Sequence, residues 1–286
     1  MSDAWESHPT EELRVKPGFS ITDVEHAATP GWTAGKDAAK DSMAKRGEQL
    51  ADLQEMLHAD GISGGQRSVL LVLQGMDTSG KGGIVRRVIG MVDPQGVSHR
   101  SFGVPTAEER AHHYLWRIEN ALPKPGKLGV FDRSHYEDVL IVRVHDLVPA
   151  KEWEQRYDEI NAFEERVAAS GTVIVKCALM VSPAEQLRRL EERLHRPDKY
   201  WKYNPGDLDE REHWDEYMQA YQAVFDRCST EVAPWYAVPT DRKWYARHAI
   251  TEILTTAFEG LGLTWPAANF DVDAERRRIE GLRGGA

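Results

Sequence analysis

Residues 68–83 read Ser-Val-Leu-Leu-Val-Leu-Gln-Gly-Met-Asp-Thr-Ser-Gly-Lys-Gly-Gly, and this stretch decides the fold. Its first seven residues form a nearly continuous apolar run, which predicts a strand buried on both faces of a parallel sheet. Residues 75–83 have the spacing Gly-x-x-x-x-Gly-Lys, and apolar side chains from Ile84 to Ile89 then recur at helical spacing. A strand, a glycine loop and a helix in this order place backbone N–H groups around a phosphate, whereas an ordinary glycine turn needs no such context.

The loop predicts a phosphate site with an unusual metal arrangement. We expect the amides of Gly80, Gly82 and Gly83 to bind phosphate oxygens, together with the ammonium group of Lys81. Many loops of this kind place a serine or threonine directly after the lysine to bind magnesium, and this chain has glycine there. A metal ion therefore needs other oxygen ligands, and Asp77 is the candidate inside the loop. The alternative for Asp77 is a turn-forming aspartate with a local hydrogen bond.

A second acidic residue follows another predicted strand. The run Leu-Gly-Val-Phe-Asp at residues 128–132 is apolar and ends in a carboxylate. In open α/β sheets, ligands bind beyond the carboxyl ends of the strands, so we expect Asp132 to provide a second metal contact beside the loop. The adjacent Arg133 offers a planar fork to a phosphate, or else a surface salt bridge. We interpret Glu137, three residues after Ser134, as a cap of the next helix, and the alternative is a role in metal or acceptor binding.

A basic segment further along the chain predicts a lid over phosphates. Arg189 and Arg193 are four residues apart and so share one helix face, and Lys199 and Lys202 follow within an aromatic-rich connection bounded by prolines. A basic helical edge of this kind closes over phosphates and neutralises charge in nucleotide kinases. The competing interpretation is an exposed basic face balanced by the neighbouring Glu191 and Glu192.

Alternation of strands with helices predicts the fold class. Further strands are expected at 127–132, 172–181 and 235–239, with helices between them, which indicates an α/β fold with a central parallel sheet between two helical layers. Predicted helix caps are Thr106 with Glu109, Ser182 with Glu185, Asp207 and Asp241. We expect an irregular arm over residues 1–40, a catalytic domain over 41–265 with a lid at about 183–230, and a loosely held tail over 266–286.

The composition excludes several classes of protein. The chain has 286 residues and a formal net charge of −10, which argues against a general nucleic-acid binder. No apolar run is long enough to cross a membrane, no secretory signal is visible at the N-terminus, and there are only two cysteines. We therefore expect a cytoplasmic protein with neither a membrane nor a nucleic-acid partner.

Several segments together resemble the polyphosphate kinase 2 family. They are Gly-Met-Asp-Thr-Ser-Gly-Lys-Gly-Gly at 75–83, Phe-Asp-Arg-Ser-His-Tyr-Glu-Asp-Val at 131–139, and Arg-Pro-Asp-Lys-Tyr-Trp-Lys at 196–202, followed by Trp-Asp-Glu-Tyr at 214–217. Shorter matches occur at 115–117, 160–164 and 233–235. The similarity runs in order over roughly residues 40 to 265, which is far more specific than the glycine loop alone.

The resemblance implies a P-loop kinase-like fold and magnesium-dependent phosphoryl transfer, with manganese as an alternative metal. The substrates it implies are inorganic polyphosphate and a nucleoside mono- or diphosphate (ADP, GDP or AMP), in a reversible reaction by a homodimer or homotetramer. By the same resemblance, the essential carboxylates are Asp77 and Asp132, with Lys81, Arg133 and the lid residue Arg193 beside them. Two alternatives remain open at this point: an ATP-dependent nucleotide kinase of related fold, and a non-catalytic nucleotide-binding regulator.

Overall fold

The fold is built on a parallel sheet. The computed structural model describes residues 4–283, and its sheet has five parallel strands in the order β2-β3-β1-β4-β5. The strands are β1 (Ser68–Gln74), β2 (Val97–Ser101), β3 (Leu128–Asp132), β4 (Thr172–Met180) and β5 (Trp235–Pro239). Central β1 pairs with both β3 and β4, so that Leu73 lies between Asp132 and Cys177. The carboxyl ends of all the strands therefore meet at one edge of the sheet.

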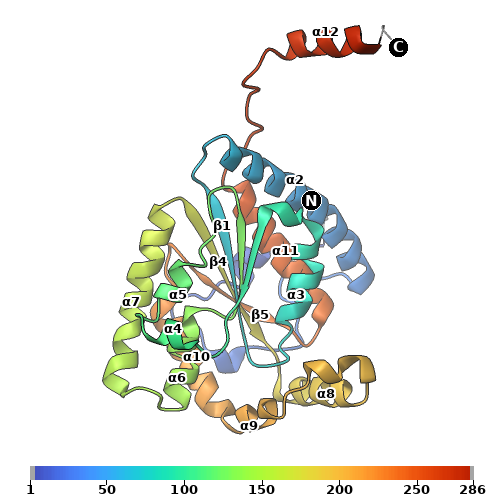
Figure 1. Cartoon of the computed structure of the whole chain (residues 1–286). Helices are drawn as coiled ribbons and strands as arrows, with labels where there is room; N and C mark the ends of the chain where they lie inside the picture. Colours follow the sequence, from blue (N-terminus) through green and yellow to red (C-terminus); the bar gives the residue numbers. More distant parts are fainter. Residues whose placement is uncertain (1–3, 284–286) are drawn as a thin grey trace.

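Helices cover both faces of this sheet, as Figure 1 shows. One face carries α2 (Lys36–Ile62), α3 (Lys81–Arg87) and α11 (Lys243–Glu259), and the other carries α5 (Trp116–Glu119), α7 (Ala150–Ala169) and α10 (Trp214–Cys228). Along β1, Leu70 and Val72 join one apolar core while Leu71 and Leu73 join the other. The alternation explains why the strand is apolar throughout: each face is packed under helices. The predicted three-layer α/β fold is confirmed.

The sequence predicted four of the five strands and missed β2. This strand reads Val-Ser-His-Arg-Ser, lies at the edge of the sheet, and exposes three of its five side chains. An edge strand that packs so little against the core needs few apolar residues, and so it has no apolar pattern to detect.

The lid region is divided into short helices. It comprises α8 (Pro183–Leu194), the 3-10 turn η5 (Pro197–Lys202) and α9 (Gly206–Glu212), and it continues into α10, which packs into the body. The predicted cap at Ser182 is confirmed, because its hydroxyl accepts from the Glu185 amide at 3.1 Å. The predicted cap at Asp207 is wrong, because this residue lies inside α9 and the long helix starts only at Trp214.

Other helix ends correct or confirm the sequence analysis. The Thr106–Glu109 capping box is present, but the helix after it, α4 (Ala107–Arg110), is short and separate from α5. Asp241 does not cap α11; its carboxylate accepts from the Ser182 amide and hydroxyl, and so ties the end of β5 to the start of α8. Short helical pieces also occur at α1 (Pro9–Glu12), η1 (Ile21–Asp23), η2 (Ile89–Met91), η3 (Pro94–Gly96), η4 (His135–Asp138) and α6 (Ile141–Val144).

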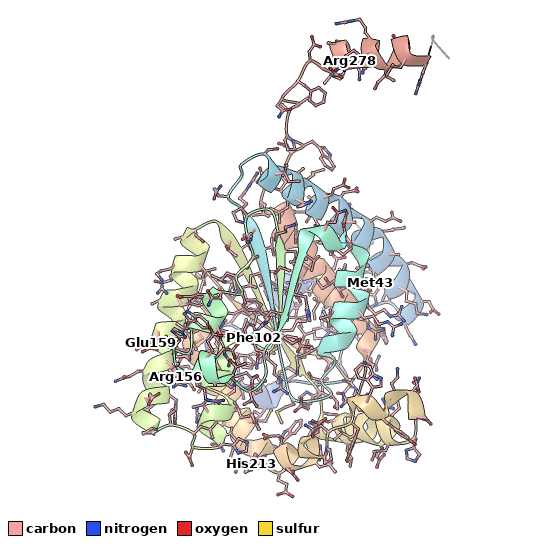
Figure 2. All side chains as sticks on the ribbon, in the orientation of Figure 1. Met43, Phe102, Arg156, Glu159, His213 and Arg278 are labelled. Carbon is pink, nitrogen blue, oxygen red and sulfur yellow. The ribbon has the colours of Figure 1, made fainter. Side chains whose placement is uncertain are left out.

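The two ends of the chain differ in how they are held. Part of the N-terminal arm pairs with the outer edge of β5: the Val15 amide donates to Trp235 and the Ala237 amide donates to Leu13, both at 2.8 Å. The C-terminal region forms a helix, α12 (Val272–Arg283), which stands away from the body and buries none of its residues. Figure 2 shows Arg278 on this separate helix. Among the described residues, no helix is both long and apolar enough to cross a bilayer.

Candidate active site

The site lies where the carboxyl ends of the strands meet. The loop after β1, the end of β3, α8 and the first turns of α11 surround a cleft of about 450 Å³. Ten of the eleven predicted site residues line this cleft, and Arg133 is the exception. The ten are Asp77, Gly80, Lys81, Gly82, Gly83, Asp132, Arg189, Arg193, Lys199 and Lys202. Residues from four separate elements thus converge on one cavity, as parallel α/β sheets arrange their ligand sites.

Glycine is required at two loop positions. Gly80 has a φ of +124° and Gly75 a φ of +151°, both of which side chains rarely adopt. A Cβ atom on Gly75 would also lie 2.8 Å from the Leu179 carbonyl oxygen. The hydroxyls of Thr78 and Ser79, which also line the cleft, are buried and have no hydrogen-bond partner within the described part of the chain. Such groups are costly unless a ligand satisfies them, which favours an anion in this loop.

Arg189 holds the loop from α8. Its guanidinium donates to the carbonyl oxygens of Thr78 and Ser79, each at 2.9 Å, and to Thr240, while Nε donates to Glu185 at 2.7 Å. The sequence predicted that Arg189 binds phosphate. That role stays a prediction: Arg189 lines the cleft, but it is buried and its donors are used here by protein oxygens. It is a support of the loop.

Lys81 is buried at the start of α3. Its ammonium group donates to the Gly75 carbonyl oxygen at 2.7 Å and contacts that of Met76 at 3.4 Å. Burial lowers the pKa of Lys81, and the Arg133 charge lowers it further, although the carboxylates of Asp77 and Asp132 oppose this. A cation stabilised this poorly gains from an added anion, and phosphate supplies one.

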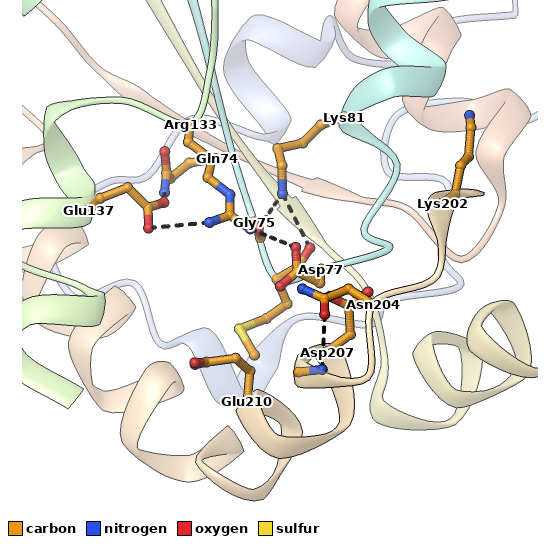
Figure 3. Close-up of polar contacts among 12 residues, drawn as sticks. Gln74, Gly75, Asp77, Lys81, Arg133, Glu137, Lys202, Asn204, Asp207 and Glu210 are labelled. Atoms are coloured by element: carbon orange, nitrogen blue, oxygen red, sulfur yellow. Dashed lines mark hydrogen bonds and ion pairs between the residues drawn. The ribbon is translucent and has the colours of Figure 1, made fainter. Parts of the chain in front are cut away.

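Arg133 lies between two carboxylates, as Figure 3 shows. Its Nη2 is 2.7 Å from Asp77 Oδ1, and its Nη1 is 3.9 Å from Glu137 Oε2. Burial alone would lower the pKa of Arg133, but Glu137 and Asp77 outweigh it and raise the pKa. The predicted capping role of Glu137 is wrong, because its carboxylate accepts from the Gln74 amide and Ser134 caps η4 by itself.

Asp132 is the free carboxylate of the site. It makes neither a hydrogen bond nor an ion pair through its side chain with any residue from 4 to 283, whereas Asp77 is shared with Arg133. Within the same range, no three acidic, histidine or cysteine side chains are grouped to hold a metal by themselves. Two carboxylates beside a phosphate site fit magnesium, which typically takes one or two carboxylates and completes its shell with water and substrate phosphates.

A second, smaller pocket adjoins Asp77 on the Arg133 side. It has a volume of about 250 Å³ and contains the carboxylates of Asp77, Glu137, Asp207 and Glu210, the side chains of Tyr217 and Tyr221, and one cation, Arg133. Burial raises the pKa of Asp207, and the nearby Asp77 charge raises it further. Asp77 lines both cavities, and so it separates a basic side from a largely acidic side.

The lid cations are engaged to different degrees. Arg193 Nη1 is 3.1 Å from Asp207 Oδ2 and 2.8 Å from the Lys202 carbonyl oxygen, and Lys199 pairs with its neighbour Asp198. The Lys202 ammonium extends away from Asp77 in Figure 3 and lies over the Trp201 ring instead. The lid therefore contributes cations to the cleft wall, and among the described residues Lys202 has no ion-pair partner.

The cleft contains a second group of cations, which had not been predicted. They are Arg86, Arg87, Lys243 and Arg247, from α3 and the start of α11, and none forms an ion pair with another described residue. Burial lowers the pKa of Arg247, and the charges of Arg87 and Arg189 add to that effect. In the sequence these residues look like ordinary exposed helix positions, and only the packing of α11 beside α3 brings them together.

Comparison with known proteins agrees with this geometry. Residues 33–261 match the family described as Polyphosphate kinase 2 (PPK2). The chain is 44% identical to an AMP/ADP-polyphosphate phosphotransferase of Meiothermus ruber, over 90% of this chain and 95% of the relative. It is 42% identical to an ADP-polyphosphate phosphotransferase of Rhodopseudomonas palustris, over 77% and 78%.

A solved structure is similar along nearly the whole chain. The crystal structure of Polyphosphate Kinase 2 from Arthrobacter aurescens shares 51% identity and a TM-score of 0.95, with 97% of this chain and 98% of that chain covered. The predicted resemblance is therefore confirmed over the glycine loop, the strand ends and the lid together. On the family match and these relatives, the chain belongs to the polyphosphate kinase 2 family.

Proposed function

We propose that this protein transfers a phosphoryl group between inorganic polyphosphate and a nucleoside mono- or diphosphate, in either direction. The observation that carries the proposal is the division at Asp77, with a basic cleft on one side and a smaller, acidic and aromatic pocket on the other. A polyphosphate has about one negative charge per phosphate, so it fits the basic cleft. A nucleoside offers hydroxyl and amino donors to carboxylates and a flat base to tyrosines, so it fits the smaller pocket.

The loop and the cleft cations bind the donor in this proposal. Amides of Gly80, Gly82 and Gly83 and the Lys81 ammonium hold the terminal phosphate, and Lys199 and Lys202 approach it from the lid. The more distant phosphates run past Lys243 and Arg247, which form no ion pair within residues 4–283. Each cation without a partner loses less by meeting a phosphate than one already held in a salt bridge.

Arg133 orients the acceptor for the transfer, and Arg193 is a cation of the donor cleft. Arg133 turns its guanidinium to the acceptor phosphate, because it is the only cation among the described residues that line the smaller pocket. An acceptor oxygen then forms a bond to the terminal phosphorus while the anhydride bond to the rest of the chain breaks, which shortens the chain by one phosphate. Such a loosely bonded transition state needs positioning and charge stabilisation more than covalent chemistry. Asp77 and Asp132 would hold magnesium, which would supply charge neutralisation at the phosphate oxygens.

The test is an acceptor screen without ATP. The protein is mixed with magnesium, polyphosphate and one of AMP, ADP or GDP, and the nucleotides are separated by chromatography. We expect a nucleotide with one more phosphate. An ATP-dependent kinase would form product only when ATP is added, and a regulator would bind nucleotide without forming product, so either result overturns the proposal.

The setting of the reaction is also part of the proposal. We place the enzyme in the cytoplasm, because the thiols of Cys177 and Cys228 are free and the cytoplasm keeps thiols reduced. We propose a homodimer or homotetramer, in line with the apolar side chains of Trp265 and Phe270 that the C-terminal region exposes. Light scattering at several protein concentrations measures the oligomeric state.

A further inference from the structure

A fully buried ion pair lies beneath the active site. Lys176 on β4 and Glu164 on α7 are 2.6 Å apart, and their side chains are 0% and 2% exposed. Burying two charges costs so much desolvation that an apolar pair of similar size is often at least as stabilising. The pair therefore calls for an explanation other than stability, and the transfer chemistry described above does not use it.

The Lys176 ammonium connects three elements. Besides Glu164, it donates to the Tyr136 hydroxyl at 2.7 Å and to the Cys228 carbonyl oxygen at 2.8 Å. An ammonium group has three donors, so all of them are used, and each acceptor belongs to a different element: η4, α7 and the last residue of α10. The end of α10, which follows the lid, is thus fixed to the same point as η4.

Glu164 extends the network toward the site. Its Oε1 accepts from the Tyr136 hydroxyl at 2.9 Å and contacts His135 Nε2 at 3.1 Å. His135 and Tyr136 open η4, only two and three residues after Arg133. Between them and Arg133, Ser134 is fully buried and its hydroxyl donates to the Gln74 side chain at 3.2 Å. Every residue from 134 to 136 is therefore held.

Arg133 needs this support because its backbone is strained. Its φ is +64°, and a left-handed conformation costs a non-glycine residue stability unless the surrounding structure enforces it. The Arg133 amide donates to Leu73 at 3.0 Å, which fixes the chain before the bend. The buried network fixes the chain after it. The guanidinium of Arg133 then lies against Asp77 and lines the smaller pocket.

We propose that Lys176, Glu164 and the Tyr136 hydroxyl are positioning residues that hold Arg133 in place for the acceptor phosphate. The inference rests on the proposed function, because it takes Arg133 as the acceptor-binding cation. It assigns these three residues no contact with substrate, and they act only through the chain that joins η4 to Arg133.

The test is a double-mutant cycle between the network and Arg133. Tyr136→Phe removes one hydroxyl and keeps the ring, so the fold persists, and Lys176→Met and Glu164→Gln are stronger changes. We expect each to lower kcat/KM for the nucleotide by about tenfold to a hundredfold, the effect of a small misplacement, while KM for polyphosphate stays within about twofold. In an Arg133→Ala background the same changes should cost less than about twofold, since no side chain remains to be positioned.

A matched control separates positioning from general destabilisation. Arg46→Met disrupts another partly buried network, the one with Glu252 and Glu259 between α2 and α11, and leaves the site alone. It should lower the melting temperature without changing either KM. Network effects that persist in full in the Arg133→Ala background, or that match those of Arg46→Met, would overturn the inference. If the wild-type protein transfers no phosphate at all, both the proposed function and this inference fail. If it does transfer phosphate and only the cycle fails, the inference alone is overturned.

Discussion

At the scale of single residues, the site combines poorly stabilised cations with an unpaired carboxylate. Lys81 is buried against backbone oxygens and repelled by Arg133, while Asp132 has no side-chain partner among residues 4–283. The buried charge of Lys81 is expensive to maintain without a ligand, and the carboxylate of Asp132 is left available to a cation. Their presence favours a site prepared for an anion and a cation together, and it makes two substitutions informative.

Replacing Lys81 should separate activity from stability. For Lys81→Ala we expect transfer to fall by about a thousandfold, because the terminal phosphate loses its buried countercharge. The melting temperature should stay the same or rise, since a strained buried charge disappears. Steady-state rates and thermal unfolding measure the two effects, with Lys40→Ala on the surface as the control. Turnover that survives in Lys81→Ala contradicts the phosphate role.

Replacing Asp132 should change the metal requirement. With Asp132→Asn, more magnesium should be needed for half-maximal rate, by roughly tenfold or more, because a neutral amide binds this ion more weakly than a carboxylate. Magnesium titrations of the rate show this, and a chelator should abolish the rate of both proteins. The exposed Asp52→Asn serves as the control. An unchanged titration in Asp132→Asn would remove this residue from the metal site.

At the scale of elements, the sequence predicts the order of the main strands and helices, but it does not predict the short helices or the edge strand. Apolar runs predicted β1, β3, β4 and β5 because each is packed on both faces. The edge strand β2 lacks that pattern. The helix caps predicted at Asp207 and Asp241 are absent, because the Asp207 carboxylate pairs with Arg193 and that of Asp241 accepts from Ser182. The loop and strand-end residues were found from local motifs, whereas the α11 cations depend on packing between distant segments.

Those cations give a prediction about chain length. Arg247→Ala should raise KM for long polyphosphate several-fold and change KM for tripolyphosphate less, since the proposed donor path places the more distant phosphates beside Arg247. Added salt should weaken binding of the long chain more steeply in the wild-type protein, because its additional ion pairs are screened. Kinetics with both donors at two ionic strengths test this, with Arg276→Ala on α12 as the control. Equal effects on both donors would place Arg247 outside the donor path.

At the scale of the whole molecule, a histidine links the N-terminal arm to the body. His248 on α11 is buried between the rings of Trp5 and Trp32, with its Nε2 3.0 Å from the Ser42 hydroxyl. Burial lowers the pKa of His248 to about 4, and the Glu252 charge opposes this only in part. The folded protein therefore resists protonation of His248 more than the unfolded chain does.

Acid should weaken the fold through this residue. Since the folded pKa lies below the ordinary value of about 6.5, the stability contribution is complete above that value and is lost as the pH falls toward 4. Between about pH 8 and about pH 5 the loss should be roughly 2 kcal/mol. Urea unfolding of the wild-type protein and His248→Gln at both pH values measures it. A wild-type loss no larger than that of the variant would contradict the assignment.

Residues 13–15, which pair with the outer strand β5, also bear on how shortened proteins behave. Without them, the open backbone of β5 becomes a template on which another chain can add a strand. Deleting the first twenty residues should thus create self-association that grows with protein concentration, beyond any fall in melting temperature. In this enzyme the arm therefore covers the outer edge of β5, and we expect its removal to cause aggregation at protein concentrations where the remaining monomer is still active.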